Sequence, residues 1–133
     1  MLLRFLLDTH ILSRWIFDSR KLSRDQLRIL EDTVRRGLQV GVSAMSLIEI
    51  AMLGASRRLP HRDVNRFFEQ LDTNPAFQIL PLTTEIAREI TALGGSLRDH
   101  GDQTIVATAR VHRLQLVTSD QRIIDSGLVS VIE

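Results

Sequence analysis

Short apolar runs recur along the chain, and the segments between them carry apolar residues at helical spacing. The first run, LLRFLL, is apolar at almost every position, which is typical of a parallel strand buried on both faces. We expect strands in the runs at residues 2–7, 38–44, 77–80, 114–118 and 129–132.

The clearest helix begins after Ser23, which forms a capping box with Gln26. Leu27, Leu30 and Val34 continue it at helical spacing until Gly37. The pattern predicts further helices over 10–17, 46–53, 84–93 and 102–113 and after Pro60, with Thr83 or Thr84 as the cap of the helix over 84–93.

Strands separated by helices, without internal repeats or linkers, predict an α/β fold. We expect one domain over residues 1–133, with a mostly parallel central sheet of about five strands and helices on both faces. In open sheets of this kind, functional sites form outside the carboxyl ends of the strands.

Composition narrows the class of protein. The chain has 133 residues, 44% of them apolar, and no cysteine, which excludes disulfides and thiolate zinc sites. Arg4 and Asp8 interrupt the apolar start, no small-residue cleavage site follows, and no run could span a membrane. We therefore expect a cytoplasmic protein without a membrane partner.

The charge is balanced, at a formal net +1, so no strong global field attracts a polyanion. Sixteen of the seventeen basic residues are arginine, and Lys21 is the exception. Arginines 57, 58, 62 and 66 could form a phosphate-binding face or simply a solvated helix surface.

Four acids follow or lie near expected strand ends. Asp8 follows the first strand, Glu49 lies one helical turn past the second, Asp102 opens a helix, and Asp120 follows LVTS. Because such strand ends share one edge, we expect these acids to converge, with Asp99 as a possible fifth member.

Clustered carboxylates repel one another unless a positive charge is supplied. Lys21 lies in an early loop, so a divalent cation is the better counter-ion. Mg²⁺ prefers oxygen ligands and can promote hydrolysis of a phosphodiester.

Each acid also has a local explanation. Asp8 could cap the helix that follows it, and Glu49 could complete a capping box with Ser46. Asp102 could cap its own helix, and Asp120 could be an ordinary turn residue. The joint placement of the acids favours the shared site.

With these residues identified, the chain resembles the PIN domain, specifically the VapC-type toxin ribonucleases of toxin–antitoxin pairs. The matching stretches occur in family order and cover nearly the whole chain: LLDTHILSRW, VSAMSLIEIAML, ILPLT, RDHGDQTIVATA and LVTSDQRI.

This resemblance implies a nuclease that cleaves RNA, transfer RNA being one candidate, with Mg²⁺ or Mn²⁺ as cofactor. It also implies a homodimer and a cognate antitoxin that blocks the site. By the same resemblance, the catalytic and metal-binding acids are Asp8, Glu49, Asp102 and Asp120, the additional metal ligand is Asp99, and the supporting hydroxyls are Thr9, Thr118 and Ser119.

One loop departs from the family pattern. Many relatives carry Asp-Pro-Phe-Asp-Arg where this chain has Asp99-His100-Gly101-Asp102-Gln103, so the proline and the arginine charge are absent. An alternative is therefore a non-catalytic PIN-like module that binds RNA or protein. A phosphoacceptor receiver domain is disfavoured, because Asp8 has no neighbouring acid and Lys21 comes too early. His10 and His100 lack a histidine partner at metal-ligand spacing.

Overall fold

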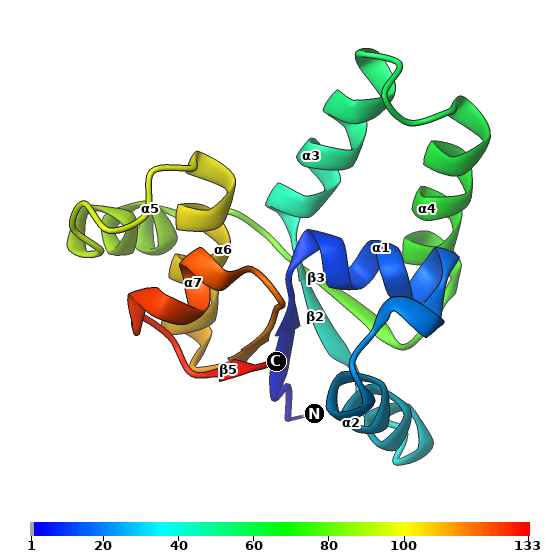
Figure 1. Ribbon diagram of the computed structural model, residues 1–133, viewed down its shortest axis with the longest axis horizontal. Helices are drawn as coiled ribbons and strands as arrows, with labels where there is room; N and C mark the ends of the chain where they lie inside the picture. The colour runs from blue at the N-terminus through cyan, green and yellow to red at the C-terminus, as the bar shows by residue number, and fades with distance from the viewer. Residues whose placement is uncertain (1) are drawn as a thin grey trace.

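A five-stranded parallel sheet forms the centre of the molecule, and the computed structural model describes residues 2–133. The strands lie in the order β3-β2-β1-β4-β5, and every neighbouring pair is parallel. They are β1 (Phe5–Leu7), β2 (Val40–Ser43), β3 (Phe77–Leu80), β4 (Gln115–Val117) and β5 (Val131–Ile132). Because all run the same way, their carboxyl ends share one edge of the sheet (Figure 1).

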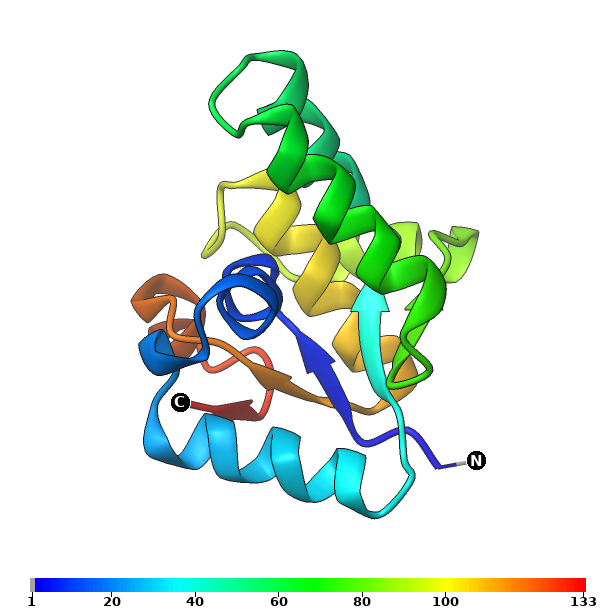
Figure 2. The same ribbon diagram turned by 90° about the vertical axis from the view of Figure 1, so that its right-hand side faces the viewer.

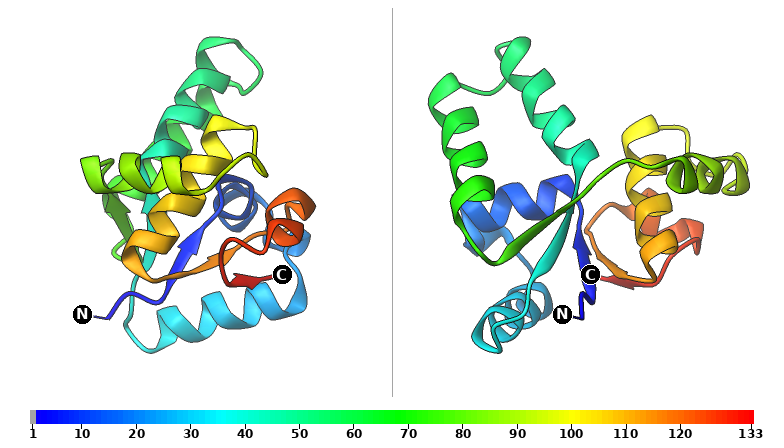
Figure 3. Two further views of the ribbon diagram at one scale, coloured as in Figure 1. Left: turned by 90° about the vertical axis from the view of Figure 1, so that its left-hand side faces the viewer. Right: turned by 180° about the vertical axis from the view of Figure 1, so that it is seen from behind.

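Helices cover both faces of this sheet, as the sequence predicts. Helices α1, α2 and α4 lie on one face and α5, α6 and α7 on the other, while α3 rises from the carboxyl edge (Figures 1 and 3). Their bounds are α1 (Thr9–Phe17), η1 (Ser19–Lys21), α2 (Arg24–Arg35), α3 (Ala44–Ala55), α4 (His61–Thr73), α5 (Thr84–Ala92), α6 (His100–His112) and α7 (Gln121–Ser126). In Figure 2, α3 and α4 form an antiparallel pair that projects beyond the sheet.

Two apolar clusters, one on each face, hold the helices against the sheet. The alternation of β1 supplies both, because Leu7 packs in the cluster that contains Phe67 and Leu6 packs in the cluster that contains Ile105. All four side chains are at most 1% exposed. Packing on both faces of the sheet therefore holds β1 in place, together with the start of α1, which lies one residue beyond it.

The first turns of α3 and α6 differ from the prediction. Helix α3 begins at Ala44 because Ser43 is its cap, with the Ser43 hydroxyl accepting a hydrogen bond from the Met45 amide at 3.0 Å. Ser46 thus lies inside the helix, and the alternative in which Glu49 caps it is wrong. Helix α6 begins at His100 with Asp99 as its cap, so the alternative in which Asp102 caps its own helix is also wrong.

Two short helices were not predicted. Helix α7 spans only QRIIDS, with Asp120 as its cap and Gly127 in a left-handed conformation at its end (φ 65°). The 3₁₀ turn η1 is shorter still, at three residues. Of the helices within residues 2–133, none is long and apolar enough to cross a bilayer.

Candidate active site

Asp8 lies at the carboxyl end of β1 with its side chain almost wholly buried. It is 4% exposed, and its Oδ2 accepts a hydrogen bond of 2.7 Å from the Thr118 hydroxyl, which follows β4. Asp8 stands at the cap position of α1, but its side chain makes no capping hydrogen bond. The local explanation for this acid, that it caps the next helix, is therefore wrong, and its side chain is held by a neighbouring strand instead.

Glu49 reaches the same edge from α3. The Thr9 hydroxyl donates to Glu49 Oε1 at 2.7 Å and lies 2.7 Å from the Ser46 hydroxyl. Because Thr9 follows Asp8 in the chain, this contact joins the end of β1 to the second turn of α3. Ser46, which the sequence suggested only as a helix cap, thus supports the bracing hydroxyl.

The amino end of α6 brings Asp99 and Asp102 to the edge. The exposed Asp99 accepts a hydrogen bond from the Asp102 amide at 2.9 Å, while the Asp102 side chain is 15% exposed. Between them, Gly101 allows a close approach, because a Cβ atom at this position would lie 2.7 Å from Glu49 Oε2. The absence of a side chain at Gly101 therefore lets α6 pack directly against Glu49.

Asp120 is bound to its own helix and to an arginine. Its Oδ1 accepts from the Arg122 amide at 2.9 Å, and its Oδ2 lies 3.3 Å from Arg122 Nη2. The same nitrogen is 3.8 Å from Asp102 Oδ2, so one guanidinium lies between the two acids. The sequence analysis did not identify Arg122 as part of the site. The feature that could have indicated it is an arginine two positions after an acid at a strand end.

Burial and mutual repulsion disturb the protonation of these acids. Burial raises the pKa of Asp8, despite the hydrogen bond from Thr118. Burial also raises the pKa of Glu49, with the charges of Asp8 and Asp99 adding to it. The pKa of Asp102 rises to about 6, through burial first and then through the charges of Asp99, Asp120 and Asp8. The four predicted acids thus lie close enough to influence one another.

Asp120 behaves differently from the other acids of the site. Burial alone would raise its pKa, but the hydrogen bonds and charge of Arg122 outweigh burial, and its pKa falls below the ordinary value. Asp120 is therefore the member of the set that already has a cation.

The protein supplies little positive charge to the remaining acids. Within residues 2–133, no lysine or arginine lies within ion-pair distance of Asp8, Glu49 or Asp99. In the same part of the chain, no three acidic or histidine side chains are grouped closely enough to enclose a metal ion alone. Mg²⁺ commonly uses only one or two carboxylates and completes its shell with water and substrate oxygens. Asp8, Glu49 and Asp99 offer carboxylate oxygens that no lysine or arginine of the described chain pairs with, and such oxygens are suitable ligands for Mg²⁺.

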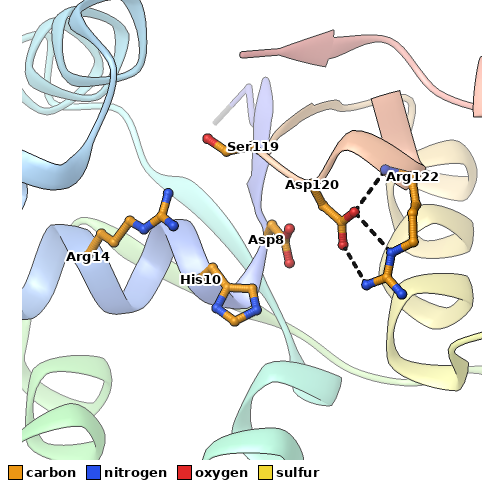
Figure 4. Close-up of a pocket in the computed structure, with 6 residues that line it drawn as sticks. All are labelled: Asp8, His10, Arg14, Ser119, Asp120 and Arg122. Carbon is orange, nitrogen blue, oxygen red and sulfur yellow. Dashed lines mark hydrogen bonds and ion pairs between the residues drawn. The ribbon is translucent and has the colours of Figure 1, made fainter. Parts of the chain in front are cut away.

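Two hollows flank the acids, and Arg122 lines both. The larger, of about 260 Å³, is lined by Asp8, His10, Arg14, Ser119, Asp120 and Arg122 (Figure 4). The other, of about 180 Å³, is lined by Ser96, Leu97, Arg98, Asp99, Asp102 and Arg122. Ser119 accepts a hydrogen bond from Gln26 Nε2 at 2.9 Å, so this predicted supporting hydroxyl is held by α2 and not by an acid.

Comparison with known families decides what kind of domain carries this site. Residues 5–127 match the PIN domain family. The chain belongs to this family. Among curated proteins, no sequence gives a significant match.

Solved structures share the fold of this PIN domain. A chain of VapBC2 from Rickettsia felis, bound to a promoter DNA fragment, has a TM-score of 0.75 at 14% identity, with 98% of each chain covered. FitAcB from Neisseria gonorrhoeae has a TM-score of 0.71 at 24% identity, covering 97% of this chain and 96% of the other. A toxin–antitoxin complex from Klebsiella pneumoniae has a TM-score of 0.64 at 27% identity, covering 96% and 95%. The resemblance to the PIN family is thereby confirmed.

The loop that departs from the family pattern forms a regular helix start in this PIN domain. His100 takes the first helical position, where proline would also fit, and Asp99 caps the helix. The Gln103 side chain donates to the Leu97 carbonyl at 2.7 Å and is thereby bound to the loop before α6. The guanidinium nearest to Asp102 comes from Arg122 on α7, so a cation is present here although Gln103 supplies none.

Proposed function

We propose that this PIN-domain protein is a VapC-type endoribonuclease that requires Mg²⁺ or Mn²⁺. The observation that carries the proposal is the pairing of the buried Asp8 with the half-buried Glu49, which have raised pKa values and no ion-pair partner within residues 2–133. Such a pair is costly unless a cation or a proton joins it. A divalent ion satisfies this need and is also the group that phosphodiester hydrolysis requires.

The chain's own residues would divide the work as follows. Asp8, Glu49 and Asp102 would hold the ion, with Asp120 assisting and Asp99 at the exposed rim. Thr118 and Thr9 would keep the first two carboxylates in place through their hydrogen bonds of 2.7 Å. When bound, Mg²⁺ or Mn²⁺ would supply a stronger water nucleophile and neutralise charge on the phosphate.

We further infer that the protein is a cytoplasmic toxin with a cognate antitoxin, and that it forms a homodimer. The relatives named above support the antitoxin, because two of them are a VapBC assembly and a toxin–antitoxin complex. The choice of RNA as substrate rests on the VapC resemblance, and transfer RNA is the first substrate to examine.

The decisive experiment is cleavage of total RNA by the purified, partner-free protein, with mapping of the new RNA ends. We expect discrete cuts with Mg²⁺ or Mn²⁺, none with EDTA, and none from the Asp8→Asn variant. Cuts that persist in EDTA, or that Asp8→Asn makes as fast, would contradict the proposal.

A second function, binding of RNA or protein without catalysis, has one observation in its favour. Asp120 is already paired with Arg122 and with the amino end of α7, which leaves fewer free ligands. The same experiment separates the two functions, because a binding module would retain RNA without cutting it in any metal.

A further inference from the structure

The hollow beside Asp8 contains a cation that the acids do not use. Arg14, on α1, is only partly exposed, and within residues 2–133 no carboxylate lies within ion-pair distance of it. Arg122, on the opposite wall, is bound to Asp120 (Figure 4). The two arginines of the hollow therefore differ: Arg122 pairs with Asp120, whereas Arg14 has no carboxylate partner among residues 2–133 and can meet an external anion without breaking an ion pair.

The neighbours of Arg14 complete a polar wall. His10 lies four positions earlier on the same helix, so both side chains belong to one face of α1. Figure 4 shows them on one side of Asp8, with Asp120 on the other. Ser119 lies at the rim, where Gln26 fixes its hydroxyl. A bound group in this hollow would lie directly beside the proposed ion-binding acids.

The lining identifies the chemistry of that group. Every residue that lines the hollow is charged or polar: no aliphatic side chain and no Phe, Tyr or Trp ring is present to anchor a base or a protein segment, and the small imidazole of His10 is the one aromatic ring. Its volume of about 260 Å³ is below the range of most small-molecule sites, which favours one phosphate with part of its sugar. The planar guanidinium of arginine matches phosphate oxygens with two parallel hydrogen bonds.

We propose that Arg14, assisted by His10 and Ser119, binds the backbone phosphate next to the scissile one in the RNA substrate. This inference rests on the proposed function and assigns Arg14 the role of a positioning residue. Because the hollow reads a phosphate and not a base, its contribution to binding is independent of RNA sequence.

The test is a fluorescence-anisotropy titration of a short, labelled single-stranded RNA of mixed sequence, in EDTA and over a series of KCl concentrations. Arg14→Gln should weaken binding by about three- to tenfold and reduce the slope of log K against log salt by about 0.7, the value for one phosphate contact on a single strand. Arg14→Lys should keep the slope and recover part of the affinity, because it retains the charge without the planar fork.

The matched control is Arg88→Gln, an exposed arginine on α5 without an ion pair in the described chain. It should change neither affinity nor slope, and melting curves should show all variants folded. An unchanged slope in Arg14→Gln, an equal loss in Arg88→Gln, or no RNA binding by the parent protein would overturn the inference.

A second readout separates this inference from the nuclease proposal. With Mn²⁺ present, Arg14→Gln should raise KM severalfold while kcat stays within about twofold, since the contact is the same before and during reaction. If the parent protein cuts no RNA, the nuclease proposal fails, while the salt series still decides the role of Arg14. A kcat that falls as much as kcat/KM would place Arg14 in the chemical step and contradict a positioning role.

Discussion

The two sides of the acid cluster are held by different means. Asp8 and Glu49 are fixed by the neutral hydroxyls of Thr118 and Thr9, each at 2.7 Å. Asp120 is fixed by a guanidinium and by the amino end of its own helix. On the first side the carboxylates keep their negative charge uncompensated, whereas on the second side an arginine already offsets it.

This difference indicates where a cation would bind most strongly. A hydroxyl fixes the orientation of a carboxylate without neutralising it, as the hydrogen-bond partners of metal ligands commonly do. An arginine orients and neutralises at once, and an incoming ion must compete with it. The hydroxyl-braced side of this PIN domain is therefore the principal cation site in our account, and the arginine-paired side is secondary.

The largest expected effect is that of Asp8→Asn, which removes the charge of the most buried acid. We predict that the rate of RNA cleavage falls by more than about a hundredfold. This loss is larger than the roughly 10- to 100-fold loss that is usual when a residue hydrogen-bonded to a metal ligand is replaced. The protein should stay folded, since an amide suits this buried position at least as well as a charged group. Asp125→Asn, an exposed acid on α7, is the control and should cleave normally. Initial rates on a labelled RNA provide the measurement.

The second largest expected effect is that of Thr118→Val, which removes the hydroxyl that holds the Asp8 carboxylate and leaves the carboxylate itself in place. The hydroxyl donates to Asp8 and accepts from the Asp120 amide, so its loss should lower cleavage by about ten- to a hundredfold with small change in melting temperature. Thr33→Val is the matched control, because that buried hydroxyl donates to the Ile29 carbonyl away from the site. Equal losses of activity in the two variants would contradict a role of the Thr118–Asp8 hydrogen bond in cleavage.

Gly101→Ala sharpens the comparison on the Glu49 side. The new methyl group would lie 2.7 Å from Glu49 Oε2 and should push that side chain off its bond to Thr9. We expect cleavage to fall by about tenfold while stability stays equal or rises, because alanine favours helix over glycine by about 1 kcal/mol. Gly95→Ala, which meets no atom within 4 Å, should leave cleavage unchanged. Thermal melting and cleavage rates measured together test this separation of stability from activity.

The pH dependence of stability tests the burial and the mutual repulsion that raise the pKa of Asp102. With a pKa raised from 3.8 to about 6, Asp102 binds a proton more readily in the folded than in the unfolded chain. In EDTA the free energy of unfolding should therefore increase as the pH falls through about 6, and this increase should be smaller in Asp102→Asn. Urea titrations between about pH 7.5 and pH 5 would measure both slopes. Identical slopes in the parent protein and in Asp102→Asn would contradict the raised pKa of Asp102.

The smallest expected effect is that of Arg122→Gln. The Arg122 side chain is 74% exposed, so its pairing with Asp120 is weak, and its removal should tighten Mn²⁺ binding severalfold at most. The control is Arg20→Gln: Arg20 lies on η1 and pairs with Asp18, the cap of that turn, and its loss should leave Mn²⁺ binding unchanged. Weaker Mn²⁺ binding by Arg122→Gln would mean that the arginine positions the acids and does not compete with the ion.

Most of the fold follows from local patterns, but its finer parts do not. Capping chemistry at Ser23 and the apolar periodicity after it predict α2, and apolar runs predict all five strands. Helix α7 escaped prediction because six residues carry too little periodicity to distinguish a helix from a turn. The sequence places the start of α3 at Ser46, whereas the helix begins at Ala44, because Ser43 is both the last residue of β2 and the cap of α3.

The site was predictable as a set of acids but not as an arrangement. The positions of Asp8 and Asp120 after apolar runs indicate strand ends, which share an edge in any parallel sheet. The bond between Thr9 and Glu49 joins residues forty positions apart, and no local pattern encodes it. Arg122 likewise shows its role only once α7 turns back toward Asp102.

The central claim is that acids from separate segments share one divalent cation, and calorimetric titration of Mn²⁺ into the partner-free protein tests it most directly. We predict saturable binding by the parent protein and by Asp125→Asn, with at least about a tenfold weaker affinity in Asp8→Asn. Binding of equal strength in Asp8→Asn, or no binding by the parent protein, would contradict the account.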